Sequence, residues 1–234
     1  MALKENFTTY DVTDGTGSTY TVTSSRVSWN DMARTETSHV SDSKGANYFD
    51  GDFIHEFEME FSDLVGSGNV VSHWGLANVQ KNMASIMNDK DDAEWFYHYS
   101  TYFYVDCVDG GDITESESLT LEAGTHYYVR IIRDDDGGSN NAGQVTAYVF
   151  KVSFDGTLVG SISAEHTIQH DFEYIYASLS YNDSTGGHSV DGFTENLDLY
   201  ARQDYTREDS SALASDDTNL STNFSTSDYI DVAT

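Results

Sequence analysis

Apolar and polar residues alternate with a period of two in many segments of this chain. Such alternation is typical of strands that bury one face, because successive side chains of a strand point to opposite sides of its sheet. Gly, Asp, Asn and Ser separate these segments, as turns require. The expected strand ranges are Thr19–Trp29, Phe53–Phe61, Asn69–Asn78, Ala93–Val108, Thr125–Asp134, Gln144–Val152, Leu158–Ser163, Phe172–Tyr181 and Val190–Arg202. The pattern predicts an all-β fold, an antiparallel two-sheet jelly-roll sandwich.

The segment Ala93–Val108 is the most aromatic of these and is long enough for one bent strand or two. Read as a single strand, it carries Trp95, Tyr97, Tyr99 and Phe103 on one face and Phe96, Tyr102 and Tyr104 on the other. One set is expected to face the core, and the other to face the concave sheet surface or an interface.

Helical patterning is poor outside residues 78–95. There Val79, Met83, Ile86 and Met87 could share one face of a helix. We expect a short helix or a structured loop in this range.

The stretch FIHEFEMEF, Phe53–Phe61, places Glu56, Glu58 and Glu60 at alternating positions. One interpretation is an acidic catalytic strand. The other is the solvent-facing side of a half-buried strand whose phenylalanines and methionine point inward.

The net charge is −29, from 40 acidic and 11 basic residues, which disfavours nucleic acid and anionic membranes as partners. No apolar run approaches the roughly 20 residues that span a bilayer, so no membrane insertion is expected. The N-terminal MALKENFTTY lacks the apolar region of a secretory signal, so we expect synthesis in the cytoplasm without a signal peptide. Cys107, the single cysteine, is expected to be a buried small apolar residue.

The composition shifts to Ser, Thr, Asp and Asn after residue 200. We expect one domain over residues 1–200, with N-terminal strands in 1–47 and the main strand motifs in 48–200. Residues 201–234 are expected to form an extended C-terminal arm that contacts a neighbouring subunit, so that a homo-oligomer forms through it.

The order of the motifs YFDGDFIHEFEMEF, LEAGTHYYVRIIRD, VTAYVFKVSFDGTLVGSI and VDGFTENLDLY resembles that of the concanavalin A-like, laminin G-like jelly-roll family. This resemblance covers roughly residues 48–200, and it implies two antiparallel sheets packed face to face. Members bind glycans, cleave β-glucans or serve as structural modules, so the fold alone does not select a function. The segments MALKENFTTY and VTSSRV further resemble modules of tailed-phage virion proteins.

The resemblance also supplies an enzymatic alternative. The β-glucanase branch of the family carries E-x-D-x-E on one strand, and Glu56, Glu58 and Glu60 occupy that frame. Glu56 and Glu60 would be the nucleophile and the general acid/base of a retaining hydrolase. The central residue departs from the family pattern, because Glu58 stands where the family has Asp.

Exposed aromatic rings are the surfaces on which sugars stack, with polar neighbours that fix their orientation. The candidate glycan-binding residues are Trp74, Trp95, Tyr97, Tyr99 and His98. Calcium is a possible ligand of the acidic turn at Asp134, Asp135 and Asp136, although the turn lacks the spacing of an EF-hand loop and also fits a simple solvated turn. No other cofactor is expected.

We therefore expect a non-enzymatic structural or adhesion module on an extracellular particle surface, of the decoration or fibre type found on phage virions, with virion subunits and glycans as partners. The alternative is a β-glucan hydrolase that uses Glu56 and Glu60.

The net charge of −29 generates one testable expectation. Repulsion among the carboxylates is screened by salt, because the Debye length falls to about 3 Å at 1 M. We expect the melting temperature to rise between low salt and 1 M NaCl in a thermal denaturation series. A melting temperature that falls over this range would contradict the expectation.

Overall fold

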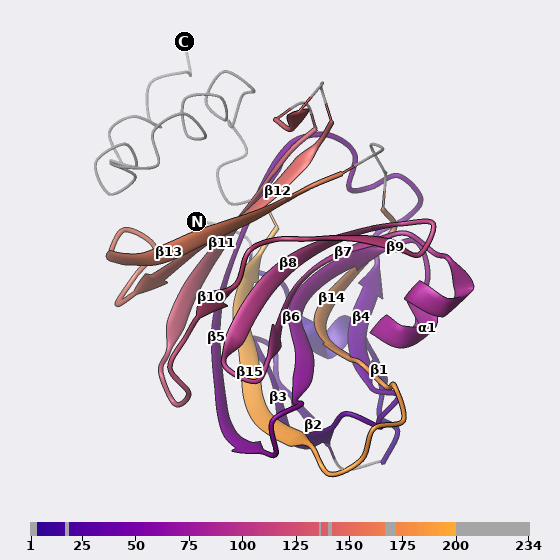
Figure 1. The fold of residues 1–234 in the computed structure, drawn as a ribbon, viewed down its shortest axis with the longest axis vertical. Helices are drawn as coiled ribbons and strands as arrows, with labels where there is room; N and C mark the ends of the chain where they lie inside the picture. The colour runs from indigo at the N-terminus through magenta and orange to yellow at the C-terminus, as the bar shows by residue number, and fades with distance from the viewer. Residues whose placement is uncertain (1–3, 17–18, 136, 140–141, 167–171, 200–234) are drawn as a thin grey trace.

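The computed structural model describes residues 4–16, 19–135, 137–139, 142–166 and 172–199. Two antiparallel sheets lie face to face, which confirms the predicted all-β jelly-roll sandwich (Figure 1). The arm expected at residues 201–234 lies outside the described residues. A short 3-10 helix, Phe7–Thr9, precedes the first strand.

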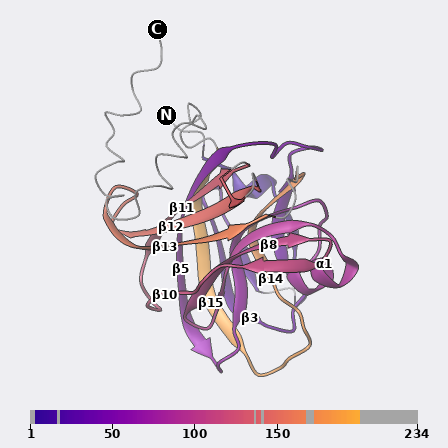
Figure 2. The same cartoon turned by 45° about the horizontal axis from the view of Figure 1, so that its top comes forward.

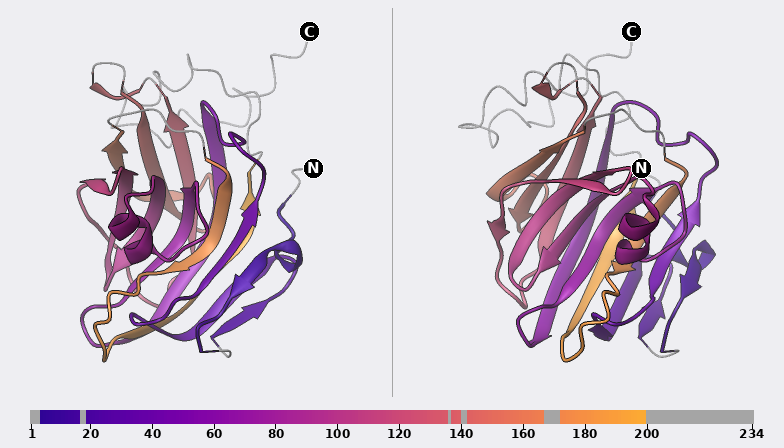
Figure 3. Two further views of the ribbon diagram at one scale, coloured as in Figure 1. Left: turned by 90° about the vertical axis from the view of Figure 1, so that its right-hand side faces the viewer. Right: turned by 45° about the vertical axis from the view of Figure 1, so that its right-hand side comes forward.

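We name the two layers sheet A and sheet B. In spatial order, sheet A contains β1 (Asp11–Thr13), β4 (His39–Ser43), β14 (Tyr174–Ser180), β6 (Val70–Ala77), β7 (Ala93–Tyr99), β8 (Tyr102–Asp109) and β10 (Leu119–Thr120), and β9 (Asp112–Glu115) also pairs with β8. Sheet B contains β13 (Thr157–Glu165), β12 (Gln144–Lys151), β11 (Tyr127–Asp134), β5 (Phe53–Val65), β15 (Ser189–Asp198), β3 (Arg26–Ala33) and β2 (Tyr20–Val22). Figures 2 and 3 show the two layers from other sides.

The main core fills the space between the two sheets. Phe57, Met59 and Phe61 of β5 have no exposed surface and point into it, as the alternation of the sequence predicts. The ring of Phe57 meets that of Phe96 from sheet A edge-on, with 6.2 Å between the centroids. Large rings therefore fill a core that contains few leucines.

The segment Ala93–Val108 forms two strands, β7 and β8, joined by Ser100 and Thr101. Ser100 adopts a positive φ of 58°, which suits a tight hairpin turn. The turn changes the predicted assignment of faces. Tyr99 pairs with Tyr102 and Tyr97 with Tyr104, so the tyrosines of the two strands lie on the same face.

The expected helix is confirmed but shorter, as α1 (Met83–Asp89). The Asn82 side chain caps it by accepting a hydrogen bond from the backbone N–H of Ser85 at 2.9 Å. The helix ends where Lys90 takes a left-handed conformation. The helix lies on the outer face of sheet A (Figure 3). Its residues Met83 and Ile86 join a second apolar cluster with Trp95.

Cys107 is buried in β8 as a free thiol, as expected. Within the part of the chain that the structure describes, no helix has the length and apolar character needed to cross a membrane.

The packing of β5 generates a stability prediction. Phe57→Ala should lower the free energy of unfolding by about 3–5 kcal/mol, because it removes a fully buried ring and leaves a cavity. Val65→Ala is the control, since Val65 lies on the same strand but is 52% exposed and should change stability by less than about 0.5 kcal/mol. Urea denaturation measures both, and equal effects of the two substitutions would refute this view of the core.

Candidate ligand-binding site

Five tyrosines gather on the outer face of sheet A, on and beside the β7–β8 hairpin. We call this set the tyrosine face, and it consists of Tyr97, Tyr99, Tyr102, Tyr104 and Tyr181. Tyr97 and Tyr104 stack with 5.4 Å between ring centroids and an interplanar angle of 24°. Tyr99 is 41% exposed and Tyr102 47% exposed. Two rings of this face are therefore available to a ligand, and the other three support them.

A fixed arginine adjoins the tyrosine face. The Arg34 guanidinium carbon lies 5.6 Å from the ring centroid of Tyr99 and 5.1 Å from that of Tyr181. Arg34 Nε donates to Asp183 Oδ1 at 2.9 Å, and its Nη2 contacts the second carboxylate oxygen. Arg34 Nη1 donates to the Gly68 carbonyl at 3.0 Å. The guanidinium is held by a two-point ion pair and presents a charged group beside exposed rings.

The Asp183 carboxylate stays ionised in this pair. Partial desolvation raises its pKa, but the hydrogen bonds from Arg34 and Thr185 outweigh that effect and hold the pKa of Asp183 below its ordinary value.

A buried polar row continues the same outer face of sheet A beside the tyrosine face. Trp95 Nε1 donates to Asp106 Oδ2 at 3.1 Å, and the Tyr97 hydroxyl donates to Glu115 Oε2 at 2.8 Å. Burial raises the pKa of Asp106 to about 7, the Trp95 hydrogen bond offsets part of that rise, and the charge of Glu115 adds to it. Asp106 is thus largely neutral at slightly acidic pH.

Four of the five predicted glycan-binding residues are buried, which corrects their expected exposure. Trp74 points into the main core, where its Nε1 donates to His55 Nδ1 at 3.1 Å. Trp95 is covered in the cluster that includes α1. Tyr97 is only 9% exposed, with its hydroxyl engaged. His98 stacks on Phe103 inside the sandwich, where burial lowers the pKa of His98 to about 4.

Tyr99 is the predicted residue that remains exposed. Sequence alternation could not identify its partner Tyr102, because the hairpin reverses the parity of the faces. Arg34 and Asp183 come from segments 149 residues apart, so no local pattern links them.

The glutamates of β5 lie on the outer face of sheet B, opposite to the inward phenylalanines. Arg130 Nε donates to Glu56 Oε1 at 2.7 Å. Glu58 accepts from Asn196 at 2.9 Å and lies 2.9 Å from His126 Nε2. Glu56 and Glu58 thus serve as partners of basic and amide groups on this face.

The acidic residues at the end of β11 and directly after it differ from a simple solvated turn. Asp134 is buried, and Asp136 lies outside the described residues. Asp135 Oδ1 is 2.8 Å from Arg133 Nε. The backbone N–H of Asp135 donates to Asp52 Oδ1 at 2.9 Å. The Asp135 carboxylate therefore already faces a cation, which disfavours its role as a calcium ligand.

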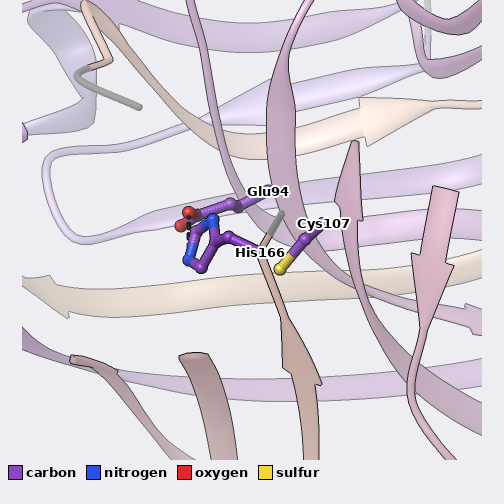
Figure 4. Close-up of side chains that lie close together, drawn as sticks. All are labelled: Glu94, Cys107 and His166. Atoms are coloured by element: carbon purple, nitrogen blue, oxygen red, sulfur yellow. Dashed lines mark ion pairs between the residues drawn. The ribbon is translucent and has the colours of Figure 1, made fainter. Parts of the chain in front are cut away.

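A further buried cluster was not predicted. Glu94 and Cys107 are cross-strand partners on β7 and β8, and His166 Nε2 lies 2.9 Å from Glu94 Oε1 (Figure 4). Arg133 Nε is 3.6 Å from the same oxygen. Burial, with the charges of Glu94 and Asp106, raises the pKa of the Cys107 thiol well above its ordinary value. The contacts of Glu94 with His166 and Arg133 indicate an internal ion-pair network. The sequence feature that could have indicated this cluster is Glu94, an acidic residue at an inward-facing position of the aromatic strand β7.

No protein-family model matches the sequence, and no curated protein matches it. Solved structures do share its fold. The legume lectin-like domain from Entamoeba histolytica has a TM-score of 0.55 and 12% identity, over 84% of this chain and 94% of that one. A mutant of the alginate lyase Aly36B, in complex with alginate tetrasaccharide, has a TM-score of 0.51 and 12% identity, over 84% and 95% of the two chains.

The exoplasmic/lumenal domain of VIP36, in its Ca²⁺/Man3GlcNAc-bound form, has a TM-score of 0.50 and 11% identity, over 81% of this chain and 83% of that one. These likenesses confirm the concanavalin A-like jelly-roll fold that the sequence motifs predicted.

The raised pKa of Asp106 predicts how stability depends on pH. The folded state keeps the Asp106 proton up to about pH 7, whereas the unfolded state releases it near 3.8. The free energy of unfolding should therefore decrease by up to about 4 kcal/mol from this group as the pH rises from about 4 to 7. Asp106→Asn imitates the protonated form and should be more stable than the wild type at pH 8.

Urea denaturation at pH 5 and pH 8 measures this difference, and Asp109→Asn is the control for the loss of one charge from the same strand. The pH-dependent role of Asp106 is refuted if Asp106→Asn and the wild type lose equal stability between the two pH values.

Proposed function

We propose that this protein is a non-enzymatic glycan-binding adhesion module whose ligand stacks on the tyrosine face. The observation that carries the proposal is the exposed cross-strand pair Tyr99 and Tyr102 beside the anchored Arg34–Asp183 ion pair. Flat rings provide apolar contact for the C–H faces of a sugar, and the ion pair provides donors and acceptors for its hydroxyl groups.

Structures of similar fold support this proposal by analogy. The VIP36 domain is described with Man3GlcNAc and the Aly36B mutant with alginate tetrasaccharide, so two proteins of this architecture hold oligosaccharides. The analogy concerns the fold, and the residues proposed here are argued from their own geometry.

The net charge of the chain favours a neutral glycan over an acidic one as the ligand. A net charge of −29 repels polyanions at long range, and Arg34 is already neutralised by Asp183. The proposed ligand is therefore a neutral oligosaccharide rather than an acidic polymer.

The setting proposed for this module is the surface of a particle such as a tailed-phage virion, as a decoration or fibre-type subunit. The support is the N-terminal resemblance to virion modules and the polar composition of residues 201–234, through which copies would associate. Binding of nucleic acid has no role in this proposal.

The alternative of a β-glucan hydrolase receives less support from the geometry. A catalytic pair needs Glu56 free to act as a nucleophile or acid, but Arg130 contacts Glu56 with two of its nitrogens. We therefore expect neither the wild type nor Glu56→Gln to release reducing ends from β-glucans, and wild-type hydrolysis that Glu56→Gln abolishes would restore the alternative.

The tyrosine face generates a binding prediction. Tyr99→Ala and Tyr102→Ala should each weaken binding of a neutral oligosaccharide by about 1 kcal/mol, roughly a fivefold increase in Kd, because each removes a stacking ring. A glycan array identifies the ligand, and isothermal titration calorimetry measures the Kd.

Tyr48→Ala is the matched control, since Tyr48 is 41% exposed, as is Tyr99, but lies outside the tyrosine face. Failure of the wild type to bind any neutral glycan on the array would reject the proposed ligand, and equal weakening by Tyr48→Ala would reject the proposed site.

A further inference from the structure

Two glutamates lie directly opposite each other on the outer face of sheet B, on the other side of the sandwich from the tyrosine face. Glu58 of β5 and Glu195 of β15 are cross-strand partners in the antiparallel register. Like charges in this arrangement are unfavourable. Their side chains are also largely withdrawn from water, at 14% and 12% exposure, so solvent screens the repulsion only in part.

A histidine completes a cluster of donor atoms. His126, which directly precedes β11, places Nε2 2.9 Å from Glu58 Oε2 and 3.9 Å from Glu195 Oε1. One donor atom from each of the three residues lies within 4.8 Å of the other two. Three separate segments of the chain thus direct one nitrogen and two oxygens towards one point.

Neighbouring groups hold the other carboxylate oxygens. Asn196 Nδ2 donates to Glu58 Oε1 at 2.9 Å, and Arg26 Nε donates to Glu195 Oε2 at 2.7 Å. The oxygens Glu58 Oε2 and Glu195 Oε1 are the ones that face His126. Hydrogen bonds of this kind orient metal ligands from outside the coordination sphere.

The His126 ring is positioned by aromatic neighbours. Its centroid lies 5.1 Å from that of Tyr128 and 5.6 Å from that of Phe193. Arg26 also covers the Phe193 ring, with its guanidinium carbon 4.0 Å from the centroid. The imidazole side chain is 35% exposed, so the cluster is open to solvent on the side of His126.

We propose that Glu58, His126 and Glu195 bind a divalent metal ion of the zinc class. Tetrahedral ligands at the usual Zn–N and Zn–O lengths are separated by about 3.3 Å. The two distances from His126 Nε2, 2.9 and 3.9 Å, lie on either side of that value. Arg26 pairs with Glu195 through Oε2 and offsets part of the negative charge, which leaves Glu195 Oε1 directed at His126. The ion offsets the remaining charge of the facing carboxylates, and the imidazole favours zinc over calcium or magnesium, which prefer oxygen ligands. Three protein ligands leave a fourth position for water.

The proposal is tested with the full chain, without an affinity tag and after treatment with a chelator. Zn²⁺ is titrated in competition with a chromophoric chelator, and Co²⁺ is added separately to record its visible spectrum. We expect one tight equivalent of Zn²⁺ and a tetrahedral Co²⁺ spectrum. The loss of a partner outside the coordination sphere costs about 10–100-fold in metal affinity, and the loss of a ligand should cost no less. Glu58→Gln and His126→Gln should therefore each weaken Zn²⁺ binding by at least tenfold.

Glu60→Gln is the matched control, because Glu60 lies on the same strand and face but outside the cluster. It should keep the wild-type affinity and the rise in melting temperature on addition of Zn²⁺. Circular dichroism identifies any variant that fails to fold, and Glu195→Gln then replaces it. Wild-type binding no tighter than that of Glu58→Gln and His126→Gln, or equal losses in Glu60→Gln, would identify His126–Glu58 as an ordinary hydrogen-bonded pair and overturn the proposal.

Discussion

Each strand residue in this sandwich directs its side chain to only one face of its sheet, and the core between the two inner faces requires large apolar side chains. Burial of Phe57, Phe96 and their neighbours removes apolar surface from water. Each Å² of buried apolar surface stabilises the folded state by about 25 cal/mol, and this is the main stabilising contribution available to the fold. The alternate residues of each strand, which do not point into this core, form the outer faces. Their chemistry is therefore decided by strand register, because a shift of one residue would exchange the two faces.

The two outer faces differ as a result. Sheet A places tyrosines and an apolar helix outside, whereas sheet B places glutamates, arginines and a histidine there. The tyrosine face offers weak, broad contacts that suit a flexible neutral ligand. The charged face offers fixed donor atoms at short distances, which suit a small ion. The proposed glycan site and the proposed metal site thus lie on opposite outer faces of one sandwich and share no residues.

The sequence was sufficient for the fold class and for the inward direction of Phe57, Met59 and Phe61, because alternation is a local property. It was insufficient where a turn or a distant segment intervenes. The Ser100–Thr101 turn moved Tyr102 and Tyr104 onto the face of Tyr99. The burial of Trp95 depends on a helix that the sequence indicated but could not place against the sheet. The ion pair of Glu56 with Arg130 depends on register between strands. Those of Glu58 and Glu94 join residues from distant segments, and no local pattern encodes either arrangement.

The buried thiol of Cys107 can report on local opening of the structure around β8, because it reacts only when it is exposed. It is the single cysteine of the sequence, it is 4% exposed, and its sulfur donates to the Ala164 carbonyl of β13 at 3.8 Å. A thiol reagent can reach it only when β8 separates from its surroundings, so the labelling rate in native buffer measures the free energy of that local opening event. Opening of the β7–β8 hairpin can therefore be followed kinetically without an introduced probe.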